Sequence, residues 1–156
     1  MVNRGIATLA SALMLCFLLL SHFDSQFFLV HFYESLIYIA IVLMLFYFQD
    51  RWAYALGILA PAAWLVLITA IGALPDFLRQ IVMVLRFQRP DFPAHLLGAL
   101  TFVLAVLMMT FCGLRWKREF AGQHKGWSTF LPCLGIIAIY YAVLVIWILR
   151  WPGAVA

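Results

Sequence analysis

The feature that most constrains this chain is an apolar run of about 22 residues at 27–48, FFLVHFYESLIYIAIVLMLFYF. A helix of that length crosses the roughly 30 Å hydrocarbon core of a bilayer. The run carries a polar stripe at positions i, i+3, i+4 and i+7, which consists of His31, Glu34, Ser35 and Tyr38. These positions share one face of a helix. Because ionisable groups are costly in hydrocarbon unless they face other helices or water, we expect the polar stripe to point into a helix bundle.

The rest of the chain has the same character. Hydrophobic residues make up 67% of the sequence, charged residues 10%, and the mean hydropathy is +1.07, whereas soluble proteins contain about 25% charged residues. No polar stretch is long enough for a folded soluble domain. We therefore predict a single all-α membrane domain over residues 1–156, a bundle of five transmembrane helices at about 6–21, 27–48, 52–74, 94–114 and 128–149.

The segment 76–89, between the third and fourth predicted helices, is too short and too charged to span a membrane. Its apolar residues recur at roughly helical period and are interrupted by Arg79, Gln80 and Arg86. This pattern predicts a short amphipathic helix that lies in the membrane interface and is anchored by its arginines.

Other local signals refine the five predicted helices. The first follows Arg4, a pattern that also fits a signal peptide, but no A-x-A-like cleavage site follows, which favours an uncleaved helix. Few residues separate the second and third helices, which predicts a tight antiparallel hairpin. Pro61 predicts a kink in the third helix, or, as an alternative found in transporters, a broken helix at a binding site. Pro132 is expected in the first turn of the fifth helix.

The basic residues predict an orientation. With the amino terminus in the cytoplasm and the carboxyl terminus outside, six of the ten Lys and Arg residues lie inside, including the densest cluster. Compact loops and the lack of a transit pattern suit a bacterial inner membrane. We interpret the net charge of +4 as topology signals and contacts to anionic lipid headgroups, not as a nucleic-acid surface. The expected headgroup contacts are Arg115, Lys117, Arg118 and Lys125.

Three histidines are expected near the outer face of the predicted bundle: His22, His31 and His95. With a carboxylate they suit a transition metal, and His31 with His95 suits axial ligation of a haem or another pigment. As a third option, Glu34 exchanges a proton with His31 or Tyr38 in a proton-coupled carrier. Against all three stands ordinary polar packing, because no HxxxH or ExxH spacing is present and His31 and Glu34 can satisfy each other.

Negative features complete the sequence-based interpretation. The three cysteines show no CxxC spacing and are expected to be small buried hydrophobes. The sequence contains no P-loop, GxSxG, HExxH or GxGxxG signature. We therefore expect a membrane protein without its own catalytic centre, a non-enzyme that acts as an accessory subunit of a larger membrane assembly. Its expected partners are lipid and either another membrane protein or a second copy of the chain.

Overall fold

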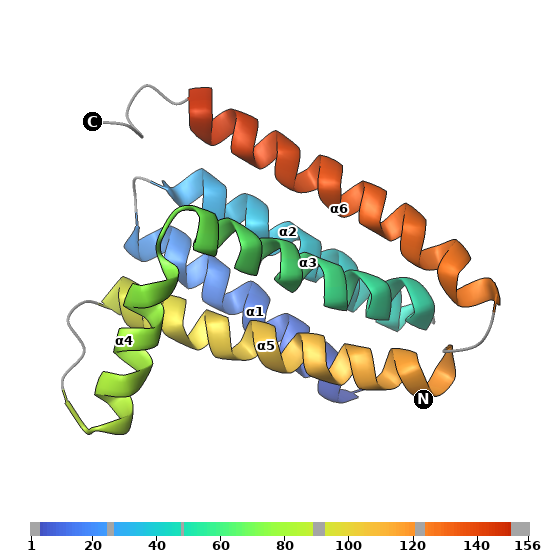
Figure 1. The fold of residues 1–156 in the computed structure, drawn as a ribbon, viewed down its shortest axis with the longest axis horizontal. Coiled ribbons are helices and arrows are strands. Elements are labelled where there is room, and N and C mark those ends of the chain that lie inside the picture. Colours follow the sequence, from blue (N-terminus) through green and yellow to red (C-terminus); the bar gives the residue numbers. More distant parts are fainter. Residues whose placement is uncertain (1–3, 25–26, 48, 89–92, 121–123, 151–156) are drawn as a thin grey trace.

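The chain folds into helices throughout its described part (Figure 1). The computed structural model describes residues 4–24, 27–47, 49–88, 93–120 and 124–150. The helices in these ranges are α1 (Arg4–Phe23), α2 (Phe28–Phe46), α3 (Asp50–Ala70), α4 (Leu74–Leu85), α5 (Pro93–Glu119) and α6 (His124–Arg150). All except α4 are long and apolar enough to cross a membrane. The prediction of an all-helical chain with five such helices is confirmed, and the fold is compatible with an integral membrane protein.

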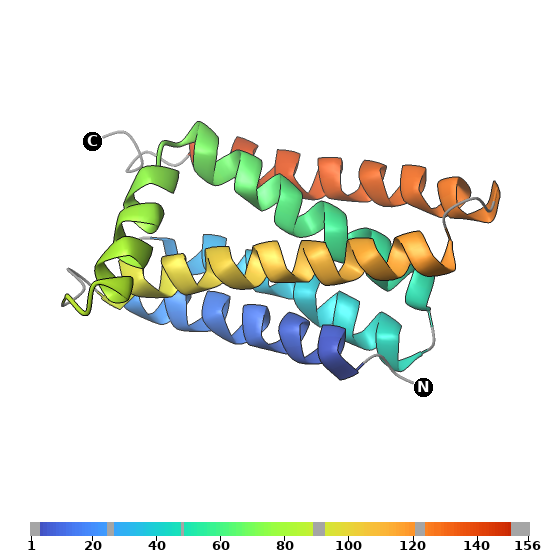
Figure 2. The ribbon, with the colours of Figure 1, turned by 60° about the horizontal axis from the view of Figure 1, so that its bottom comes forward.

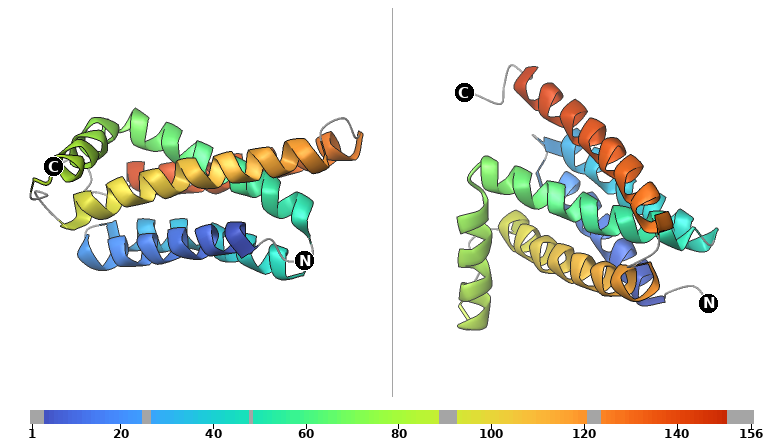
Figure 3. Two further views of the ribbon diagram at one scale, coloured as in Figure 1. Left: turned by 90° about the horizontal axis from the view of Figure 1, so that it is seen from below. Right: turned by 45° about the vertical axis from the view of Figure 1, so that its right-hand side comes forward.

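The five long helices run roughly along one axis, and α4 crosses one end of the bundle (Figures 1 and 2). Helix α1 packs against α2 and α5, while α3 packs against α2, α5 and α6. Helix α6 lies on the outer side of the bundle (Figure 3). We call the end crossed by α4 the α4 end; α2 and α5 begin there, and α1, α3 and α6 end there. The opposite end, where α1 begins, is the N-terminal end.

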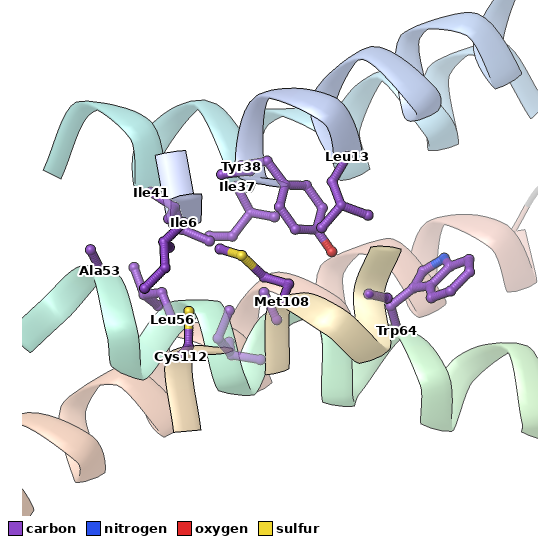
Figure 4. Packing of buried hydrophobic residues seen from close by; sticks show 14 of the residues in the cluster. Ile6, Leu13, Ile37, Tyr38, Ile41, Ala53, Leu56, Trp64, Met108 and Cys112 are labelled. Carbon is purple, nitrogen blue, oxygen red and sulfur yellow. The ribbon is translucent and has the colours of Figure 1, made fainter. Parts of the chain in front are cut away.

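The core lies where α1, α2, α3 and α5 meet (Figure 4). Aromatic rings connect three of these helices: Phe17 of α1 stacks on Tyr38 of α2 and meets Trp64 of α3 edge to face. Close approach of α3 and α5 depends on Gly57, because a Cβ there would lie 2.5 Å from the Cys112 Sγ. This is the small-residue packing expected between membrane helices. All three cysteines are buried and free.

Helix α4 is docked on the bundle by Phe77. Its ring stacks on Trp64 of α3 with a centroid distance of 6.3 Å, and it occupies the space that a side chain at Gly98 of α5 would need. Gly72, with φ of 78°, makes the turn from α3 into α4, a backbone conformation that glycine adopts without strain. The structure thus confirms a separate short helix between the third and fourth long helices.

Several boundaries differ from those predicted. Helix α3 ends at Ala70, because the apolar residues that follow enter the Gly72 turn and α4, which itself covers 74–85 instead of 76–89. Helix α5 continues to Glu119, five residues past the predicted end, since Arg and Lys are good helix formers and suit a helix C-terminus. Helix α6 begins at His124, so Pro132 lies inside the helix. Our prediction that Pro132 is in the first turn is therefore wrong.

Candidate functional site

The polar stripe of α2 contains a graded series of ionisable groups at the α4 end. Nδ1 of His31 lies 3.1 Å from Oε2 of Glu34, and Nε2 of His31 lies 3.8 Å from Oδ2 of Asp24. The exposed fraction of the side chain falls from 36% in Asp24 to 20% in His31 and 3% in Glu34. One imidazole therefore connects a carboxylate at the end of the bundle with a carboxylate in its interior.

Burial limits the charge states of this series. An unpaired buried carboxylate costs several kcal/mol, so Glu34 is either protonated or balanced by a protonated His31. Each of these two forms of the pair has no net charge. The two forms differ only in which side chain carries one shared proton. The geometry is therefore that of a site where His31 and Glu34 share a proton and Asp24 lies next to them at the surface.

The other members of the polar stripe differ in their hydrogen bonds. Ser35 donates to the Phe32 carbonyl of its own helix at 2.6 Å, so its hydroxyl is satisfied locally. Tyr38 lies one turn deeper than Glu34 and is fully buried, with its hydroxyl directed into the core (Figure 4). Within the described part of the chain this hydroxyl has no hydrogen-bond partner.

Two tyrosines of α6 and one of α2 extend the polar region in a way the sequence analysis did not predict. Tyr33 and Tyr140 stack with centroids 4.2 Å apart, and each hydroxyl donates to the other's backbone carbonyl. Tyr141 is buried and donates to the Ala60 carbonyl at 3.2 Å. Paired tyrosines in α6 were the available signal, but only the packing of α6 shows that Tyr140 meets Tyr33 of α2 and that Tyr141 meets Ala60 of α3.

The three histidines share one end of the bundle but not one site. His22 is exposed at the end of α1, and His95 is exposed in the first turn of α5. Among the described residues, no group of three or more His, Cys, Asp and Glu side chains is placed to hold a metal ion. Both ring nitrogens of His31 face carboxylates. This arrangement favours proton binding over axial ligation as the role of His31.

The expected headgroup contacts lie at the N-terminal end. Arg115, Lys117 and Arg118 are exposed in the last two turns of α5, and Arg115 is 3.4 Å from Glu119. Lys125 belongs to the first turn of α6, and its side chain lies outside the described part.

Comparisons with known proteins do not assign this site. No protein-family model matches the chain, and searches of curated proteins and of solved structures give no match. Its interpretation therefore depends on the chemistry of its own residues.

Proposed function

We propose that this chain is an integral membrane protein of the proton-coupled carrier class, in which Glu34 takes up and releases a proton. The observation that carries the proposal is the graded series from Asp24 through His31 to Glu34. Ionisable groups inside membrane helices are rare, and series of acidic and histidine side chains are typical of proton pathways.

The surroundings of Glu34 support a pathway open at one end. Beyond Tyr38, the buried face of α2 continues with Ile41 and Leu45, which are apolar. In this conformation a proton therefore reaches Glu34 from the α4 end. Coupling to a second solute then requires a conformation in which the bundle opens toward the N-terminal end, as in alternating access.

Glu34→Gln tests the proton site, because it keeps the shape of the side chain and removes its titration. In the wild type we expect an infrared carboxyl band that changes with pH. After a pH jump, Glu34→Gln should take up one proton fewer per chain than the wild type. Asp76→Asn is the matched control, since Asp76 is exposed on α4 at the same end. An unchanged infrared titration in Glu34→Gln contradicts the proposal. In liposomes, the same variant should lose proton-linked flux.

A second proposal, that the chain acts as an accessory component of a larger membrane assembly, is favoured by the outer face of α6. Gly135, Ala138 and Ala142 share that face and are exposed, and a Cβ at Gly135 would meet nothing within 4 Å. Small exposed residues at helical spacing allow another membrane helix to approach closely. The partner is another membrane protein or a second copy of the chain.

The assembly proposal is tested by adding bulk to this face. Gly135→Ile should release the partner in mild-detergent extracts, measured by native mass spectrometry. Gly113→Ile is the control, because Gly113 of α5 also has open space around it. Recovery of the wild type as a lone chain, or a complex that survives Gly135→Ile, contradicts the assembly proposal.

The membrane placement is also a proposal. We infer that the N-terminal end faces the cytoplasm of a bacterium, that the α4 end faces outward, and that α4 lies in the outer interface. The basic cluster on α5 supports the orientation. The exposed apolar residues of α4 beside Arg79 and Arg86 support the interfacial placement.

A further inference from the structure

A pocket at the N-terminal end is lined by residues that take no part in the proposed proton site. It has a volume of about 270 Å³ and opens between the first turn of α1 and the last turns of α5, both of which lie at this end (Figure 1). Its lining combines apolar walls with two guanidinium groups and consists of Gly5, Ile6, Phe111, Leu114, Arg115 and Arg118.

The two arginines are one turn apart on α5 and are available to a ligand. No carboxylate lies within 4 Å of Arg118 in the described part of the chain. Arg115 contacts Glu119, but these side chains are 48% and 36% exposed, and such a surface pair is weak. Guanidinium groups bind phosphate oxygens with paired, charge-assisted hydrogen bonds. Two of them over one pocket therefore match a phosphate group.

The apolar walls and the position of the pocket favour a phospholipid over free inorganic phosphate as its ligand. Phe111 and Leu114 lie on the membrane side of the arginines along α5, so an apolar surface continues from the guanidinium groups toward the hydrocarbon. A phospholipid has its groups in the same order, because its phosphate is followed by apolar acyl chains. An inorganic phosphate has no apolar part that could contact these walls.

The distribution of charge favours an anionic lipid over a zwitterionic one. By their places in the chain, the N-terminal end holds six basic residues and two acidic ones, Asp50 and Glu119. Among the described residues, the α4 end holds three basic and three acidic residues, with Glu34 counted among them. Within the described part of the chain, the excess of four positive charges therefore lies at the end that contains the pocket. Basic residues near a membrane surface attract anionic lipids.

We infer that this pocket is a specific binding site for the phosphate headgroup of one anionic phospholipid, held by Arg115 and Arg118. The site is independent of the proton chemistry of Glu34, which lies toward the opposite end of the bundle. It also differs from general headgroup contact, because it requires the two arginines that line the pocket and not the lysine between them.

Native mass spectrometry of the full chain in mild detergent, with added phosphatidylglycerol, tests this site. The wild type should retain one phosphatidylglycerol molecule, and Arg115→Gln/Arg118→Gln should bind it at least about tenfold more weakly. Arg4→Gln/Arg51→Gln is the matched control, since it removes two positive charges from the same end of the bundle without changing a residue that lines the pocket, and it should bind like the wild type. Leu114→Trp, which fills the pocket without changing charge, should also weaken binding.

Three results overturn the inference. Equal retention by the arginine variants and the wild type shows that the pocket does not hold the lipid. Equal retention of phosphatidylcholine shows that the site does not select an anionic lipid. Displacement of phosphatidylglycerol by millimolar inorganic phosphate shows that the pocket takes free phosphate instead. A helical circular dichroism spectrum like that of the wild type establishes that each variant is folded.

Discussion

At the scale of single residues, the contact between His31 and Glu34 decides how the buried carboxylate is tolerated. Their 3.1 Å hydrogen bond gives the almost fully buried Glu34 side chain a polar partner. His31→Ala should therefore destabilise the fold by about 2 kcal/mol, less than for a fully buried pair because His31 is 20% exposed. Glu34→Gln should cost about 1 kcal/mol, from a weaker hydrogen bond.

The double variant His31→Ala/Glu34→Gln tests this coupling. It should be more stable than His31→Ala alone, because a neutral amide without a partner costs less than a carboxylate without one. Thermal unfolding in mild detergent measures all four proteins of the cycle. Strictly additive losses contradict an energetic coupling between the two side chains.

Two buried tyrosines provide a matched comparison. The Tyr141 hydroxyl donates to the Ala60 carbonyl, whereas the Tyr38 hydroxyl has no partner among the described residues. Tyr141→Phe should therefore lose about 1 kcal/mol of stability, and Tyr38→Phe should lose none or gain up to about 1 kcal/mol. The same unfolding assay measures both. A larger loss in Tyr38→Phe shows that its hydroxyl has a partner that stabilises the fold.

The sequence predicted part of this site. Helical spacing alone placed His31, Glu34 and Tyr38 on one face, because the period of a helix does not depend on what surrounds it. It did not connect Tyr140 with Tyr33 or Tyr141 with Ala60, since these contacts depend on how α6 packs on the bundle. It also grouped His22 and His95 with His31 from their common end, although sharing an end does not place side chains within ligand distance.

At the scale of helices, close packing of α3 on α5 depends on one missing side chain. Gly57→Ala would force its Cβ against the Cys112 Sγ and the Met108 methyl group, so we expect a destabilisation of about 1 to 3 kcal/mol. Gly113→Ala adds the same methyl group to α5 in open space. It should be neutral or stabilise by up to about 1 kcal/mol through helix propensity. Melting temperatures in detergent give the comparison, and equal effects of the two substitutions contradict the packing argument.

Helix α4 presents two different faces at the α4 end. Leu78, Val82 and Leu85 form an exposed apolar face, and Asp76 lies on another exposed side of the same helix. If α4 lies in the interface, a spin label at Val82→Cys should be accessible to oxygen dissolved in lipid, and a label at Asp76→Cys to a water-soluble nickel complex. Electron paramagnetic resonance measures both. Equal accessibility at the two positions contradicts the interfacial placement.

The existence of α4 followed from its apolar period, but its limits did not. Hydropathy marks where apolar side chains stop, whereas a helix ends where its backbone hydrogen bonds end. Basic side chains at the end of α5 therefore continue the helix that we expected to stop at residue 114. At Gly72 the opposite occurs, because an apolar run continues through a turn.

At the scale of the whole molecule, the five long apolar helices and their order along the chain were predictable, but their neighbours were not. Alternating spans follow from hydropathy and short connections. Which helices pack together depends on small residues such as Gly57 and on aromatic contacts such as that of Phe17 with Trp64. These contacts involve side chains of similar hydropathy, so the apolar pattern alone does not select them.

In the proposed function, the orientation of the bundle determines from which compartment Glu34 receives its proton. The two ends carry different net charges, and the basic end is expected in the cytoplasm. In spheroplasts, an impermeant maleimide should therefore label Gln88→Cys, next to α4, without permeabilisation. It should label Lys117→Cys only after permeabilisation. Both positions are exposed, while the native cysteines are buried, so background labelling should be low.

The reverse labelling pattern would show that the bundle is inserted the other way round. The proposed proton uptake would then take place from the opposite compartment. Asp24 lies at the α4 end with Gln88, so the proposed pathway through Asp24 takes its protons from the compartment in which Gln88→Cys is labelled. With the α4 end outside, acidifying the external medium should protonate the site, and acidifying the lumen of inverted vesicles should have the same effect. A proton site loaded from the basic end contradicts the pathway through Asp24, whichever way the chain is inserted.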